Sequence, residues 1–162
     1  NITFCFSQQQ DCEPLMQNIL EDSKTKCAFY DLDNNSIYSI INKNNIPLLM
    51  EEENALPGSM PIYQKGIMHH KFCVNETHVL MGTLNPTFRG FTKNDNVLIL
   101  LESAYLSKNY QHEWTKLLMR KKGNTQYTSL VYNGYLLENY FCIPSHVLND
   151  FARPSAGDLR WR

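Results

Sequence analysis

The sequence predicts an α/β fold in which a mixed, largely parallel β-sheet is flanked by helices. The first third of the chain alternates strand-length apolar segments with segments of helical periodicity, an order that favours parallel strands covered by helices. Residues 97–101 are apolar throughout, as in a strand with both faces buried. With 162 residues that are 43% hydrophobic, the chain is long enough for one core and short for two.

The N-terminal elements follow from local patterns. Pro14 suits the first turn of a helix, because its missing N–H would have no helical partner there. Asn44-Asn45 marks the end of the second helix. In chain order we expect a strand at 2–7, a helix at 11–22, a strand at 27–31, a helix that starts at a cap within 33–35, and a strand at 46–50.

The middle of the chain supplies the remaining strands and the longest helix. Residues 51–64, with three glutamates and Pro57-Gly58, predict a loop. We expect residues 66–74 and 78–81 to pair as a hairpin. Residues 104–120 have the apolar spacing of an amphipathic helix, and the basic residues at its end suit the helix dipole.

The C-terminal part is predicted to be an extension. Asn133-Gly134 is a strong turn signal between strands at 127–132 and 135–143. Residues 140–143 are similar to residues 3–6, which would fit the start of an incomplete second repeat, although chance similarity is the simpler interpretation. We therefore divide the chain into a main domain, residues 1–122, and an extension, residues 123–162.

Charge and hydropathy exclude some classes of protein. The net charge of −1 argues against a strongly basic nucleic-acid binder, but it leaves room for a local cationic patch. No run of eighteen apolar residues is present, so we expect no transmembrane helix in this chain. Any targeting or anchor segment is expected to lie outside it, and the compartment stays open.

The five cysteines do not predict a metal site. There is no C-x-x-C pair and no Cys/His group at zinc spacing. Cys5 and Cys12 flank a predicted strand-to-helix turn and can approach each other. We favour buried free thiols over a disulfide between them.

Residues 68–76 hold the densest group of reactive side chains. Side chains alternate along a strand, so His69 and Lys71 share one face while His70 faces the opposite layer. An imidazole and an ammonium on one face can reach the same phosphate. His69 can attack phosphorus or transfer a proton, and Lys71 can neutralise a non-bridging oxygen. We assign both to the site and give His70 a packing role.

Polar residues after the next strand extend this candidate site. Gly82 allows close backbone approach, and the Thr83 hydroxyl and Asn85 amide can aim donors at one oxyanion. Asp95 can accept a hydrogen bond from the imidazole Nδ1, while a cap at the strand start is an equal alternative. Glu76, in the hairpin turn, is expected to act indirectly or structurally.

Basic residues near these motifs could bind the substrate. Together with Lys71, a cationic groove would use Lys65, Arg89 and Lys93. A metal site built from the histidines is disfavoured, because strand alternation separates His69 from His70 and no carboxylate-rich cluster accompanies them. We expect no metal and no cofactor.

These motifs resemble the signature of the phospholipase D superfamily, which is H-x-K-x4-D, then G-S/T-x-N and a later acidic residue. The likeness is to its small single-motif members, the bacterial periplasmic endonuclease type and the mitochondrial phospholipase D-like endonuclease type. Glu76 stands where the family usually has Asp. The matching segments are His69-x-Lys71-x4-Glu76, Gly82-Thr83-x-Asn85 and Asn94-Asp95-Asn96.

The resemblance implies a phospholipase D-like catalytic domain and a metal-independent mechanism. In the family, one histidine attacks phosphorus to form a phosphohistidine, and a histidine from a second motif protonates the leaving oxygen. Because this chain carries one motif, the resemblance implies a homodimer in which two copies of His69 share one active site.

From this we predict a phosphodiesterase, most simply an endonuclease for single-stranded or flexible nucleic acid. Whether the nucleic acid is DNA or RNA is not determined. The first alternative is a phospholipid hydrolase or phosphatidyltransferase, which predicts an apolar channel or a membrane-facing patch near residues 55–60. The second alternative is a non-catalytic binding module that keeps the fold.

Overall fold

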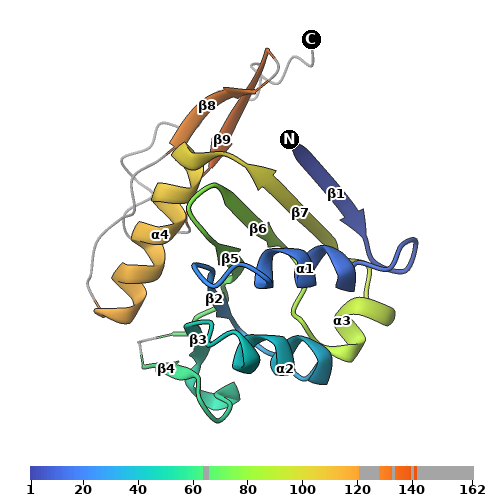
Figure 1. Ribbon diagram of the computed structural model, residues 1–162, viewed down its shortest axis with the longest axis vertical. Coiled ribbons are helices and arrows are strands. Elements are labelled where there is room, and N and C mark those ends of the chain that lie inside the picture. The colour runs from blue at the N-terminus through green and yellow to red at the C-terminus, as the bar shows by residue number, and fades with distance from the viewer. Residues whose placement is uncertain (64–65, 121–127, 133, 140, 142–162) are drawn as a thin grey trace. The chain divides into compact units, whose positions relative to one another are not determined.

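The computed structural model describes residues 1–63, 66–120, 128–132, 134–139 and 141 (Figure 1). The chain forms two compact units, Asn1–Thr125 and Gln126–Arg162, which are described separately. The division into a catalytic domain and an extension at residues 122 and 123 stays a prediction. Among the described residues, no helix is both long enough and apolar enough to span a membrane.

A seven-stranded sheet forms the centre of the first unit. Its strands lie in the spatial order β1-β7-β6-β5-β2-β3-β4. The sequence predicted a loop where the structure has strand β4, because Pro61 argues against a strand. The strand can contain this proline since it lies at the edge of the sheet, where the missing N–H costs no pairing bond. The strands are β1 Ile2–Phe6, β2 Lys26–Phe29, β3 Leu48–Glu51, β4 Met60–Ile62, β5 Lys71–Val74, β6 His78–Gly82 and β7 Val97–Glu102.

The sheet is mixed, as predicted, but its parallel part is smaller than predicted. Only β2–β3 and β3–β4 are parallel pairs, and the other four neighbouring pairs are antiparallel. Parallel neighbours need a long crossover, and the short turn between β5 and β6 can only return the chain antiparallel. The first strand also pairs far along the chain, with Ile2 opposite Leu101.

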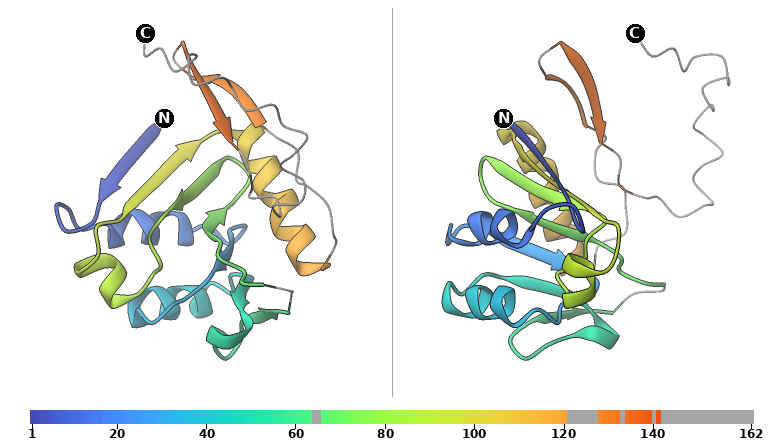
Figure 2. Two further views of the ribbon diagram at one scale, coloured as in Figure 1. Left: turned by 180° about the vertical axis from the view of Figure 1, so that it is seen from behind. Right: turned by 90° about the vertical axis from the view of Figure 1, so that its right-hand side faces the viewer.

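Helices cover both faces of this sheet. The helices α1 (Glu13–Leu20) and α2 (Asn35–Lys43) lie side by side on one face, and α4 (Ala104–Leu118) lies on the other (Figure 2). The predicted cap of α2 is confirmed, because the Asn34 side chain accepts a hydrogen bond from the Ile37 N–H. The short helix α3 (Phe88–Thr92) was not predicted from the sequence.

The helix α4 packs on the central strands through its aromatic residues. The Tyr110 ring meets the Phe72 ring edge-on with centroids 5.0 Å apart. The indole Nε1 of Trp114 donates to the Cys27 carbonyl oxygen at 2.8 Å. Leu118, the last residue of the helix, belongs to its apolar pattern but is 41% exposed.

Two disulfides correct the predicted state of the cysteines. Cys5 is bonded to Cys12, where free thiols were favoured, and Cys27 is bonded to Cys73, a pair that the sequence did not suggest. The second pair forms because Cys27 and Cys73 lie directly opposite each other on β2 and β5. All four residues are buried, and three of them have no exposed surface.

The predicted strand over residues 66–74 is shorter than expected. Its first half is irregular, and strand pairing begins at Lys71. Gly66 has φ +97°, a conformation that favours glycine. The backbone N–H of Met68 donates to the carboxylate of buried Glu51 at 2.5 Å instead of to a neighbouring strand. This bond to Glu51 fixes the backbone of the segment that leads to the His-x-Lys motif.

The second unit contains an antiparallel hairpin. Its strands are β8 (Thr128–Tyr132) and β9 (Tyr135–Asn139), with Tyr132 opposite Tyr135. Gly134 has φ +84°, as the predicted two-residue turn requires. The prediction of an incomplete second repeat rests on residues 140–143, of which the structure describes only Phe141.

Candidate active site

The pairing register brings most of the predicted site residues to one end of the sheet. The antiparallel partners β5 and β6 place Lys71 and Gly82 at this end, because one strand begins where the other ends. Because β2 pairs with β5, the residues that follow Phe29 lie at this same end. Because β6 pairs with β7, the residues that precede Val97 lie there too. This end of the sheet, which we call the motif end, is the candidate active site.

His69 and Lys71 lie against the same aromatic ring. The centroids of the Tyr30 and His69 rings are 4.8 Å apart, with the planes tilted by 59°. The Lys71 Nζ lies 5.3 Å from the Tyr30 ring centroid, which is a cation–π distance. This Nζ also donates to the His69 carbonyl oxygen at 3.0 Å. The imidazole and the ammonium are thus held together on the surface of Tyr30.

The electrostatics of Lys71 bring its titration close to neutral pH. Burial lowers the pKa of the Lys71 ammonium from its usual 10.5 to about 8, and the negative charge of Asp31 opposes this shift. Asp31 follows Tyr30 at the end of β2, and Phe29 lies opposite Lys71 in the pairing. An amine with a pKa near 8 is still largely charged at neutral pH.

The electrostatics of His69 favour its neutral form. Partial burial lowers the pKa of the His69 imidazole below its usual 6.5, and the nearby Lys71 and His70 lower it further. The residue as a whole remains exposed. A neutral imidazole at neutral pH is the form that can attack phosphorus or accept a proton.

His70 faces the opposite layer, towards α4. Its ring meets the Phe72 ring edge-on at 5.6 Å, and its Nε2 lies 3.2 Å from the Glu113 carboxylate. Glu113 is only 3% exposed and also lies 2.5 Å from the Lys116 Nζ. A buried carboxylate needs partners that donate hydrogen bonds or carry positive charge. The structure therefore places His70 in a packing position beside this carboxylate.

Gly82 ends β6, and Thr83 begins the connection to β7 that contains α3. An added Cβ on Gly82 would lie 2.0 Å from the Val97 carbonyl oxygen, so the close approach there is to the neighbouring strand. The Thr83 hydroxyl donates to the Asn96 Oδ1 at 3.0 Å and accepts from the Val97 N–H at 3.1 Å. The hydroxyl proton of Thr83 is thus engaged within the chain.

Asn85 has unused hydrogen-bonding capacity. Its side-chain Oδ1 is buried, and no described residue supplies a partner for it. The oxygen and nitrogen of an amide are interchangeable by a flip, so either an acceptor or a donor can be presented at this position. Buried polar atoms are normally paired, so the Asn85 amide is incompletely satisfied within the described residues, and its role in binding an oxyanion stays a prediction.

Among the described residues, no hydrogen bond or ion pair joins the acidic residues of the motifs to the His69 imidazole. Asp95 is exposed in the turn before β7. Its role as imidazole orienter stays a prediction. Glu76 lies at the other end of β5 and forms an exposed ion pair with Lys24, at 3.0 Å, which contributes little to stability.

The predicted cationic groove is described in part. Arg89 and Lys93 are exposed on and just after α3, which lies between β6 and β7 at the motif end. The backbone N–H of Phe88, at the start of this helix, donates to the Asp33 carboxylate at 2.5 Å. Lys65 lies outside the described residues.

Three residues of this region were not assigned to the site from the sequence. They are Tyr30, which touches both His69 and Lys71, Asp31, which acts on the Lys71 charge, and Glu51, which holds the Met68 backbone. The sequence signal was their position directly after or at the end of apolar strand segments. It became meaningful only when β5 was placed beside β2.

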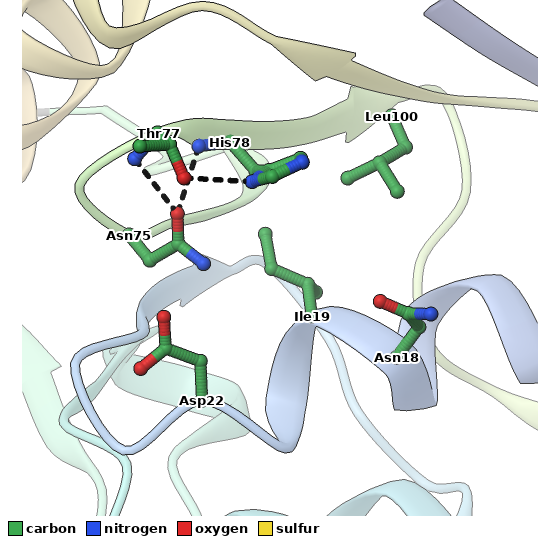
Figure 3. A pocket seen from close by; sticks show the side chains of 7 residues that line it. All are labelled: Asn18, Ile19, Asp22, Asn75, Thr77, His78 and Leu100. Atoms are coloured by element: carbon green, nitrogen blue, oxygen red, sulfur yellow. Dashed lines mark hydrogen bonds between the residues drawn. The ribbon is translucent and has the colours of Figure 1, made fainter. Parts of the chain in front are cut away.

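A pocket lies at the end of the sheet opposite the motif end (Figure 3). Its volume is about 220 Å³, and its lining combines polar side chains with the apolar Ile19 and Leu100. The Asn75 Oδ1 accepts from the N–H groups of Thr77 and His78, and the Thr77 hydroxyl lies 2.8 Å from the His78 Nδ1. This turn is a local structure that closes the β5–β6 hairpin.

The described residues hold no metal-binding group. No cluster of three or more His, Cys, Asp or Glu side chains among them has the geometry to hold an ion. The histidines His69, His70 and His78 are separated. His69 lies against Tyr30, His70 lies near Glu113, and His78 lies at the end of β6 opposite the motif end.

A mixed sheet covered by helices, with an imidazole and an ammonium at one end, defines a phospholipase D-like domain. Residues 15–118 match the family described as cardiolipin synthase, PLD-like domain. The chain belongs to this family, and the superfamily assignment made from the motifs is confirmed. No curated protein matches the sequence.

Solved structures show the same fold at low sequence identity. The chain is similar to Nuc from Salmonella typhimurium, a phospholipase D family member, with a TM-score of 0.64 and 15% identity over 74% of this chain and 94% of that one. NucT from Helicobacter pylori gives a TM-score of 0.56 and 12% identity over 74% and 96%. Phosphatidylserine synthase from Haemophilus influenzae Rd KW20 matches with a TM-score of 0.55 and 13% identity, over 72% of this chain and 36% of the synthase.

Proposed function

We propose that this protein is a metal-independent phosphodiesterase that cleaves single-stranded or flexible nucleic acid through a phosphohistidine intermediate. The observation that carries the proposal is the placement of His69 and Lys71 on one aromatic ring at the motif end of the sheet. The pair offers a neutral nucleophile beside a cation, which is what attack on an anionic phosphodiester needs.

In the proposed reaction, the His69 imidazole attacks phosphorus and the bond from phosphorus to the leaving oxygen breaks. The leaving oxygen takes a proton from the His69 of a second copy of the chain. Water then attacks the phosphohistidine, the same second histidine removes its proton, and the N–P bond breaks to release a phosphomonoester. In this proposal Lys71 neutralises a non-bridging oxygen and the Asn85 amide binds another. Each dimer would use its two histidines in one site.

Nucleic acid is favoured as the substrate because exposed cations lie at the motif end. Arg89 and Lys93 are both exposed there, and backbone phosphates on either side of the cleaved bond would need such charges. A flexible or single-stranded substrate suits a site at the end of a sheet, where a phosphodiester must reach between two histidines.

A phospholipid substrate is the second candidate. The structure describes no large exposed apolar side chain among residues 55–60, where the patch was predicted, and Leu56 packs against the core. Tyr63 is 46% exposed and Ile67 is 65% exposed, in the segment that leads to His69. Exposed aromatic and aliphatic residues beside a catalytic motif suit contact with a lipid surface.

One assay distinguishes these functions. We expect cleavage of single-stranded DNA or RNA to be unchanged by excess EDTA, and a vesicle of phosphatidylglycerol and cardiolipin to be cleaved slowly or not at all. Faster turnover of the vesicles would establish the lipid function. Loss of cleavage in EDTA, restored by a divalent cation, would contradict the phosphohistidine mechanism. Binding without turnover of any of the three substrates would leave a binding module.

The Lys71 charge gives a pH dependence to anion binding. We expect sulfate, whose charge is constant between about pH 6 and pH 10, to bind more weakly as pH rises through about 8, by up to about tenfold per unit, because Lys71 loses its proton there. Calorimetric titration from pH 6 to pH 10 measures this step. In Lys71→Met the step near pH 8 should be absent; its persistence would show that another group causes it.

A further inference from the structure

We infer that Tyr30 is a positioning residue of the active site, whose ring holds both the His69 imidazole and the Lys71 ammonium in place for attack on phosphorus. As a role in catalysis, this inference rests on the phosphodiesterase function proposed above. Tyr30 lies outside the His-x-Lys, Gly-Thr-x-Asn and Asp95 motifs, and it comes from a different strand, at the end of β2.

The first argument is that one ring serves two groups. The His69 ring lies 4.8 Å from the Tyr30 centroid, and the Lys71 Nζ lies 5.3 Å from it. The attack of an imidazole on phosphorus depends on its orientation, and a misplacement of one ångström costs about 10²-fold in rate. Lys71 is a long flexible side chain, and the ring together with the His69 carbonyl limits its range.

The second argument is that Tyr30 is itself held on both sides. Its backbone N–H donates to the His70 carbonyl oxygen at 2.9 Å, and its carbonyl oxygen accepts from the Asn54 side chain at 2.9 Å. The disulfide between Cys27 and Cys73 joins the two strands that lead to Tyr30 and away from Lys71. A group that positions others must be fixed by such contacts of its own.

The third argument is that the ring affects the charge of Lys71. The face of an aromatic ring stabilises a cation, so Tyr30 supports the protonated form of Lys71, as the carboxylate of Asp31 does from the next position. Burial acts in the opposite direction. Removal of the aromatic face should therefore shift the titration of Lys71 to lower pH.

The test compares Tyr30→Leu with Tyr30→Phe and with the control Tyr105→Leu. Tyr105 is 56% exposed and lies in the first turn of α4. The N–H of Ser103, the cap of that helix, bonds to the Thr77 carbonyl oxygen, so Tyr105 lies at the end of the sheet opposite the motif end. Two quantities are measured: kcat and KM on the phosphodiester bis(p-nitrophenyl) phosphate, and the pH midpoint for acetylation of Lys71 by acetic anhydride, followed by mass spectrometry.

We expect Tyr30→Leu to lower kcat by about 10²-fold with a smaller change in KM, and to lower the Lys71 midpoint by about half a pH unit. Tyr30→Phe, which keeps the ring, should stay within about threefold in kcat and keep the midpoint. Tyr105→Leu should match the wild type in both. These results together would support the positioning role.

A folded Tyr30→Leu variant with wild-type kcat and midpoint would overturn the inference, as would a Tyr30→Phe variant as impaired as Tyr30→Leu. If Tyr30→Leu does not fold, Tyr30→Trp replaces it, since an indole is the strongest cation–π partner and should keep or raise the midpoint; a lower midpoint would overturn the inference. The Lys71 midpoint needs no activity. A shifted midpoint in a protein that cleaves no phosphodiester would refute the proposed function and leave the contact of Tyr30 with Lys71 established.

Discussion

Replacing His69 by Asn should lower kcat for phosphodiester cleavage by about 10³-fold or more, because the amide can neither attack phosphorus nor transfer a proton. His69 is exposed and bonds to the rest of the chain mainly through its contact with Tyr30, so the fold should be unaffected. Single-turnover cleavage of a labelled oligonucleotide, together with thermal unfolding, measures both effects.

The neighbouring histidine provides the matched control. The same change at His70 should cost less than about tenfold in kcat but should lower the thermal midpoint, because it removes a partner of the buried Glu113 carboxylate. The reverse ranking of the two variants in kcat would refute the assignment of His69 as the nucleophile.

The proposed shared site can be examined with the same variant. If wild-type and His69→Asn chains are unfolded together in equal amounts and refolded, a shared two-histidine site predicts that activity per wild-type chain falls to about half, since half of these chains pair with an inactive copy. A site complete within one chain predicts no change. The second result would contradict the homodimer.

Replacing both Cys27 and Cys73 by Ala should lower the free energy of unfolding by about 4 kcal/mol, because this disulfide closes the longer loop in the unfolded chain. The two cysteines are 46 residues apart and are buried between neighbouring strands. Urea denaturation at neutral pH measures the loss, which for a small domain is a large part of the total stability.

The second disulfide is the control for this prediction. Cys5 and Cys12 are 7 residues apart, so the same double replacement there should cost about 2.5 kcal/mol. Thiol titration of the denatured, unreduced wild-type chain should find at most one free thiol among its five cysteines. Four or five free thiols would contradict both disulfides, and an equal cost of the two double replacements would contradict the loop-length explanation.

Local patterns were sufficient to predict most of the elements that build the main sheet. The cap at Asn34, the amphipathic helix that begins at Ala104 and the apolar strand that begins at Val97 all depend on residues close together in sequence, although only Leu98 and Leu101 of that strand are buried. Patterns failed where a local signal was ambiguous. Pro61 argued against a strand at a position where the structure has an edge strand. The apolar residues before His69 suggested strand pairing, but the backbone N–H of Met68 bonds to the Glu51 carboxylate instead.

The family signature could also be recognised in the sequence, because each of its motifs consists of residues that lie within a few positions of one another. His69 and Lys71 lie on the Tyr30 side, and His70 lies on the α4 side, whatever the strand bounds. The sequence by itself thus determined the class of protein, and it predicted the pair of side chains that the structure brings onto one ring.

Only the tertiary structure decided what surrounds that pair. The antiparallel register of β2 with β5 places Tyr30 and Asp31 beside His69 and Lys71, and it brings Cys27 opposite Cys73. The same folding leaves Asp95 exposed without a bond to His69 in the described chain. These relations depend on strand pairing between residues some forty positions apart, and no local pattern specifies such a register.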